Sequence, residues 1–138
     1  VQDRAELMGT MQEATQTFTF LLAGIAAVSL LVGGIGIMNI MLVSVTERTR
    51  EIGIRMAMGA TRRQVLTQFL LEALVLCLVG GLVGIAVGFG ASRTLANLAN
   101  WSTSVSPEAV GMAVAFSAIV GLFFGAWPAR RAASLDPI

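Results

Sequence analysis

Three long stretches without a charged residue most constrain how this chain can fold. They cover residues 18–45, 73–91 and 109–127. A helix needs roughly 20 apolar residues to cross about 30 Å of hydrocarbon, so each stretch is long enough. Only 12% of the 138 residues are charged, whereas soluble domains average roughly 25%. The chain is therefore predicted to be an all-α membrane protein with transmembrane helices at 18–45, 65–91 (with an interfacial start) and 109–127.

Several residue types that catalysis requires are missing from the sequence. There is no histidine, and all nine basic residues are arginine. A phosphate-binding loop of the Walker type needs a lysine, and Ser-His-Asp or Cys-His catalysis needs a histidine. Cys77 is the single cysteine, which excludes an internal disulfide or a zinc site built from cysteines. The chain is thus expected to have no catalytic or metal-binding residues of its own, and its net charge of +1 gives no reason to expect nucleic acid as a partner.

The arginines predict the orientation of the three helices, because cytoplasmic loops carry an excess of basic residues. The segment 46–64 contains five arginines and the tail 128–138 contains two, whereas 92–108 contains one. Segments 46–64 and 128–138 are therefore predicted to be cytoplasmic. The N-terminal segment 1–17 and the loop 92–108 are predicted to lie outside.

Local signals predict where the helices begin and end. Ser106-Pro107-Glu108 combines an N-cap, a proline at the first helical position and an acid in the first turn. Gly59 is typical of a helix C-terminus, and Thr61–Gln64 has the pattern of a capping box that starts the next helix. Pro128 is expected to follow the third transmembrane helix.

An apolar stripe runs through the polar N-terminal segment 1–17 into the first span. Its members are spaced four, three and four residues apart: Leu7, Met11, Ala14 and Phe18. Heptad spacing favours packing of one helix on another. A stalk helix packed on a partner helix is one interpretation, and an amphipathic helix lying on a larger external domain is the other.

Small residues four apart in the spans predict close helix packing, since helices in lipid associate through close backbone contact. The predicted packing residues are Gly33, Gly80, Gly84, Gly88, Ser117, Gly121 and Gly125. The alternative is that glycine is simply frequent in membrane helices. Asn39, a polar residue within the first span, is predicted to hydrogen-bond between helices rather than to contact a substrate or ion. Glu72 is expected to reach the inner interface or pair with an arginine, rather than to relay protons.

The segment 46–64 carries charges of both signs beside apolar residues. Helical spacing places Glu47, Arg48, Glu51 and Arg55 on one arc, with Ile52 and Met56 as an apolar edge. A loop that only sets topology needs arginines but not glutamates, and a helix lying on lipid would also favour basic residues. The pattern favours a docking surface for another protein.

Two runs of residues resemble the FtsX-like permease family of ABC transporters, and within it the macrolide-exporter (MacB) type. They are Leu30–Met41 and Ser44–Ala60, with further similarity in 69–88, 127–133 and 135–137. The resemblance implies a dimeric permease with four spans, of which this chain would be the C-terminal piece. It also implies a bacterial inner-membrane location, with the N-terminus outside and the C-terminus in the cytoplasm.

The resemblance further implies roles for particular segments. Residues Glu47 to Gly59 would contact an ABC ATPase domain, which would bind ATP and Mg. Leu7 to Phe18 would form the stalk. A second permease copy and membrane lipid would be partners, and a periplasmic adaptor and an outer-membrane channel are further candidates.

The predicted function is that of the membrane part of an ATP-driven exporter. Conformational changes of the ATPase would pass through rigid helices to a periplasmic domain and drive efflux of macrolide-type or other substrates. The alternatives are a lipoprotein-releasing or other FtsX-like permease, and a structural membrane anchor. A fragment of a secondary transporter or channel is a further alternative, which the scarcity of intramembrane acids disfavours.

Overall fold

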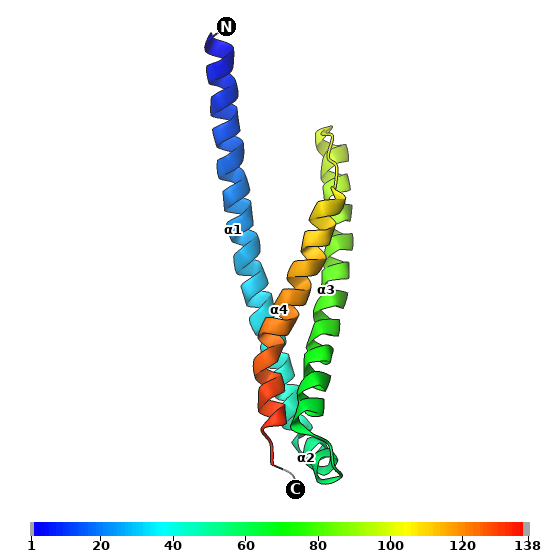
Figure 1. Ribbon diagram of the computed structural model, residues 1–138. Helices are drawn as coiled ribbons and strands as arrows, with labels where there is room; N and C mark the ends of the chain where they lie inside the picture. The colour runs from blue at the N-terminus through cyan, green and yellow to red at the C-terminus, as the bar shows by residue number, and fades with distance from the viewer. Residues whose placement is uncertain (1, 137–138) are drawn as a thin grey trace. The chain divides into compact units, whose positions relative to one another are not determined.

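The computed structural model describes residues 2–136, which contain four helices and no strand (Figure 1). The helices are α1 (Gln2–Glu47), α2 (Thr49–Ala57), α3 (Arg62–Ala99) and α4 (Pro107–Ala133). Helices α1, α3 and α4 are long and apolar enough to cross a membrane. The predicted all-α class with three candidate membrane spans is confirmed.

Helix α1 joins the predicted stalk and the first span without a break. Its residues 2–33 form a compact unit of their own, in which every side chain is exposed. The stalk stripe belongs to this unit: Leu7, Met11 and Phe18 are each more than 60% exposed, and Ala14 is exposed too. Packing of this stripe on another helix therefore stays a prediction, and the partner helix would lie outside residues 2–33.

Residues 34–138 make up the second unit. Within its described part, α3 and α4 pack side by side in opposite directions (Figure 1). Asn100 ends α3 in the left-handed conformation, and the Trp101 N–H donates to the Ala96 carbonyl at 3.0 Å. The connecting loop is shorter than the predicted 92–108, because α3 continues to Ala99. Residues 92–99 contain no glycine or proline that would stop the helix earlier.

Helix α4 begins as predicted but ends later. The Ser106 hydroxyl accepts a hydrogen bond from the Ala109 N–H at 3.2 Å, with Pro107 at the first helical position. The expectation that Pro128 follows this helix is wrong, since Pro128 lies inside α4, which continues to Ala133. An interior proline costs a helix about 3 kcal/mol. Burial of Pro128 and the alanines after it offsets that cost.

The hydrophobic core of the second unit lies at the predicted cytoplasmic end of the spans. All four helices contribute to it: Met41 and Val45 of α1; Ile52 of α2; Val65, Phe69 and Ala73 of α3; Ala129, Ala132 and Ala133 of α4. The short helix α2 is thus built into the same core as the membrane-spanning helices.

Small residues hold α3 and α4 together in three consecutive contacts. A methyl group added to Gly125 would overlap the Cβ atom of Ala73. One added to Gly121 would lie 2.8 Å from the Cβ atom of Cys77. The third contact pairs Ser117 with Gly81, so each helix advances by one turn from contact to contact. Three of the predicted packing residues, Ser117, Gly121 and Gly125, therefore lie in this interface.

The other predicted packing residues make no close contact with another helix among residues 2–136. Nothing lies within 4 Å of a methyl group built on any of the glycines Gly33, Gly80, Gly84 or Gly88, and Asn39 is exposed. Their immediate neighbours take the internal contacts instead: Gly81 meets Ser117, and Gly34 lies under the ring of Phe124. Within the described residues, the α3 contacts to α4 therefore use Gly81, and packing through Gly33, Gly80, Gly84 and Gly88 stays a prediction.

Candidate functional site

Helix α2 is held between two tight connections at the predicted cytoplasmic end. Arg48 alone separates it from α1. At its other end Gly59 takes a φ of 107°, a conformation that favours glycine, and its N–H donates to the Met56 carbonyl at 3.1 Å. Thr61 and Gln64 then form the predicted capping box at the start of α3. Both predictions, the glycine end and the capping box, are confirmed.

The inner face of α2 is buried in the core. Ile52 is only 3% exposed, Gly53 is buried, and Met56 is half-buried against the same cluster. Ile52 and Met56 were predicted to form the apolar edge of a docking surface. The structure instead places these two side chains against the core, where they attach α2 to the rest of the bundle. Side chains four residues apart lie on the same face of a helix, and here that face is the inner one.

The outer face of α2 is accessible and combines charged with apolar side chains. Its members, here called the α2 outer face, are Arg50, Glu51, Ile54 and Met58, all exposed. Ile54 is 47% exposed and Met58 is 83% exposed. The sequence pattern places Ile54 and Met58 close to the charges, which makes the helix look imperfectly amphipathic. The structure explains this pattern, because Ile52 and Met56 pack against the core whereas Ile54 and Met58 are exposed.

Two polar links join the segment around α2 to α3. The Arg55 guanidinium forms an ion pair with Glu51 and also donates to Gln68 Oε1 at 2.9 Å. Arg48 Nη1 lies 3.6 Å from Glu72 Oε2. The expectation that Glu72 pairs with an arginine is confirmed. Arg48 and Arg55 therefore make polar contacts within the molecule, although both are exposed. Glu47 at the end of α1 is exposed too.

The described residues contain no candidate metal site. Within 2–136 no three His, Cys, Asp or Glu side chains come together as metal ligands, and no charged side chain is buried. The site consists of a helix that packs into the core through Ile52 and Met56 and has a mixed polar and apolar outer surface. Such a surface can bind another macromolecule.

Residues 23–137 match the FtsX-like permease C-terminal family. The chain belongs to that family. It is 52% identical over all 138 residues to the ABC transporter permease YknZ of Bacillus subtilis. It is 52% identical over 138 residues to the macrolide export ATP-binding/permease protein MacB of Bdellovibrio bacteriovorus, and 53% identical to that of Syntrophobacter fumaroxidans.

These relatives are much longer than the chain. The 138 residues span 35% of YknZ and 21% and 19% of the two MacB proteins. Membership in the permease family and three apolar helices together make this a multi-pass membrane protein of the FtsX and MacB permease type.

Proposed function

We propose that this chain is the membrane-spanning part of an ATP-driven exporter and that the α2 outer face docks on its ATPase domain. The observation that carries the proposal is the two-sided construction of α2. Ile52 fixes the inner face in a core shared by all four helices, while Ile54 and Met58 leave apolar surface exposed beside charges. Apolar area rimmed by polar residues is typical of protein interaction sites. ATP and Mg would be bound by the ATPase domain and not by this chain.

Movement of α2 would be transmitted through the core contacts of Ile52 and Met56. The core joins α2 to α1, α3 and α4, and the small-residue contacts keep α3 and α4 close along several turns. Helix α1 continues without a break from Glu47 to Gln2. A push on α2 would thus reach the external end of α1, where the stalk stripe would pass it to a periplasmic domain.

The proposed assembly contains two copies of the permease in the bacterial inner membrane, with the N-terminus outside. A periplasmic adaptor and an outer-membrane channel would complete the export route. The cargo is proposed to be of the macrolide type, because the two MacB relatives are named for macrolide export. In this mechanism the cargo is moved outside the membrane, and the tightly packed helices need not open a pore.

The test is the ATPase activity of the full-length transporter in nanodiscs, comparing wild type with Ile54→Asp/Met58→Asp. Reversing Glu51 and Arg55 is a less specific test, because Arg55 also holds Gln68. Leu98→Asp is the control, since Leu98 is 79% exposed at the far end of α3. Altered hydrolysis, or loss of ATPase binding where the ATPase is a separate chain, is expected only for the double variant. Wild-type hydrolysis and binding in that variant would favour a structural anchor.

The cargo is tested separately by macrolide resistance. Expression of the full-length transporter in an efflux-deficient bacterium is expected to raise the erythromycin concentration that stops growth, and Ile54→Asp/Met58→Asp is expected to abolish the increase. Unchanged susceptibility with an active wild-type ATPase would exclude erythromycin as cargo. The docking of α2 would be unaffected by that result.

A further inference from the structure

Helix α1 has two opposite faces within the second unit. On one face Met41 and Val45 are buried in the core. Asn39 lies on the opposite side of the helix, and its side chain is exposed. Ile35 and Val43, one turn to either side of it, are 46% and 57% exposed. These three residues, here called the Asn39 face, have no partner helix in the part of the chain that the structure describes.

Asn39 lies deep in the predicted membrane span. The first charged residue after it is Glu47, eight positions later. At about 1.5 Å per residue, that charge is about 12 Å away along the helix axis, farther than the short asparagine side chain reaches. The hydroxyls of Thr19 and Thr46 donate to backbone carbonyls of their own helix, whereas the Asn39 amide makes no such bond within residues 2–136. Because an unpaired amide in hydrocarbon is costly, Asn39 requires a partner from another molecule or segment.

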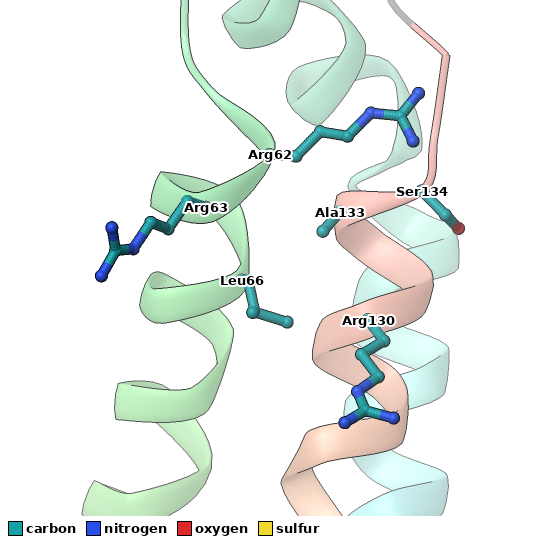
Figure 2. A pocket seen from close by; sticks show the side chains of 6 residues that line it. All are labelled: Arg62, Arg63, Leu66, Arg130, Ala133 and Ser134. Atoms are coloured by element: carbon teal, nitrogen blue, oxygen red, sulfur yellow. The ribbon is translucent and has the colours of Figure 1, made fainter.

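The arginines near the ends of α3 and α4 do not have the same requirement. They are exposed at the predicted cytoplasmic end, where water can solvate them. Figure 2 shows that the side chains of Arg62, Arg63 and Arg130 point in different directions, so they do not form one binding site. Asn39 differs from them because its surroundings in the membrane contain no water.

Asn39 also continues the heptad spacing of the stalk stripe. Alternating steps of three and four residues lead from the stripe to Asn39 through these positions: Phe18, Leu21, Ile25, Val28, Val32, Ile35 and Asn39. A step of four leads from position d of a heptad to position a, so Asn39 occupies an a position. A single asparagine at an a position fixes the register and the number of helices in a coiled coil. Within membranes, polar side chains of this kind also hold helices together.

We propose that two copies of this chain pack in parallel through the Asn39 face, with the two Asn39 amides hydrogen-bonded to each other across the two-fold axis. In a symmetric dimer a residue on the axis meets its own counterpart. An amide has both N–H donors and a carbonyl acceptor, so two asparagines can satisfy each other. The inference rests on the two-copy assembly proposed above. It adds the face that joins the copies and the contact that sets their register.

A second copy explains the Asn39 face better than lipid or an unrelated helix. Lipid tails offer the amide neither a donor nor an acceptor. A different membrane helix would have to supply its own polar side chain at the matching depth and heptad position. A second copy supplies that side chain by symmetry.

Cysteine cross-linking in membranes tests which face joins the copies. The full-length protein carries Cys77→Ala, so that the introduced cysteine reacts alone, and no ATP is added. Ile35→Cys is expected to form a disulfide-linked dimer on oxidation. Ile40→Cys is the matched control, because Ile40 is 65% exposed at a similar depth but lies to the side of the Asn39 face. It should cross-link several-fold less, and both variants change exposed positions and are expected to fold.

Förster transfer between labelled copies of the full-length protein, diluted in liposomes, tests the amide pair. Asn39→Leu keeps an apolar contact but removes the amide, and it is expected to weaken dimerisation about 3- to 30-fold. Asn39→Gln retains an amide and is expected to weaken it less. Ser44→Ala is the control, since it removes a polar group of the same helix that lies off the Asn39 face. It should dimerise as the wild type does.

Two results would overturn this inference alone. Equal cross-linking of Ile35→Cys and Ile40→Cys would show that the Asn39 face does not meet a second copy. Wild-type dimerisation of Asn39→Leu would exclude the amide pair. A dimer with either result would leave the two-copy assembly in place, whereas a monomeric wild type would overturn that assembly as well. Failure of α2 to dock on an ATPase domain would change neither readout.

Discussion

Gly125 of α4 lies against Ala73 of α3 so closely that a single added methyl group would overlap the Cβ atom of Ala73. This contact is the inner end of a series that continues through Gly121 beside Cys77 and Ser117 beside Gly81. Glycine is therefore required at position 125 because of packing, since its backbone is ordinary helix.

Gly125→Ala is accordingly expected to destabilise the full-length protein. Overpacking a close contact costs about 1–3 kcal/mol, which exceeds the gain of about 0.5–1 kcal/mol from replacing a helical glycine by alanine. Gly111→Ala, in the same helix but facing open space, is expected to be neutral or stabilising. Thermal unfolding in detergent measures both. Equal melting temperatures for the two variants would contradict the close contact.

The two faces of α2 predict opposite outcomes for neighbouring isoleucines. Ile52→Ala removes a buried side chain from the core and is expected to cost about 2–5 kcal/mol of stability. Ile54→Ala trims an exposed side chain and is expected to change stability by less than about 0.5 kcal/mol while lowering ATPase coupling. Chemical denaturation and ATP hydrolysis, measured on the same preparations, separate the two effects. Loss of hydrolysis without loss of stability in Ile52→Ala would reverse the assignment of the faces.

Features that depend on a few adjacent residues could be predicted from the sequence. Thr61 and Ser106 cap helices because their hydroxyl oxygens accept hydrogen bonds from free backbone N–H groups. Gly59 follows the end of α2 because glycine adopts a positive φ without strain. The three spans follow from apolar length alone. None of these features needs knowledge of a partner helix.

Choices between faces could not be predicted. Glycines at 80 and 81 are equally small, and only the register of α4 decides that Gly81 meets Ser117. Likewise, Ile52 and Ile54 are chemically identical, and the position of the core decides which is buried. Helix α4 continues through Pro128 because Pro128 and the alanines after it are buried in the core. Local helix propensity takes no account of such burial and predicts a helix end at proline.

Gly59→Ala is expected to loosen the end of α2. Its φ of 107° is strained for any residue with a side chain, at a cost of about 1–2 kcal/mol, although nothing nearby would clash with the added methyl group. Hydrogen–deuterium exchange of residues 49–60 in the full-length protein is expected to rise. Gly24→Ala, at an open helical position, serves as the control and should leave that exchange unchanged. Unaltered protection in Gly59→Ala would show that the turn tolerates another backbone conformation.

The hydrogen bond between Arg55 and Gln68 is expected to matter for the position of α2 more than for global stability. Both Arg55 and Gln68 are exposed, and exposed polar links contribute only about 0–1 kcal/mol. Gln68→Ala should therefore shift the melting temperature little but increase hydrogen exchange in α2. Thr67→Ala, whose hydroxyl bonds only within its own helix, is the control. A large loss of global stability in Gln68→Ala would mean that the link supports the whole core.

The exposed stalk stripe leads to a prediction about the proposed second copy. If two stalks pack through Leu7, Met11, Ala14 and Phe18, a cysteine at position 11 should lie close to its counterpart. Met11→Cys in a Cys77→Ala background is expected to form a disulfide-linked dimer under mild oxidation in membranes. Gln16→Cys lies on the opposite side of the helix and should cross-link far less. Gel electrophoresis of the full-length protein without reductant measures both. Equal cross-linking at the two positions would mean that the stripe does not face a second stalk, and would favour packing of this segment on an external domain.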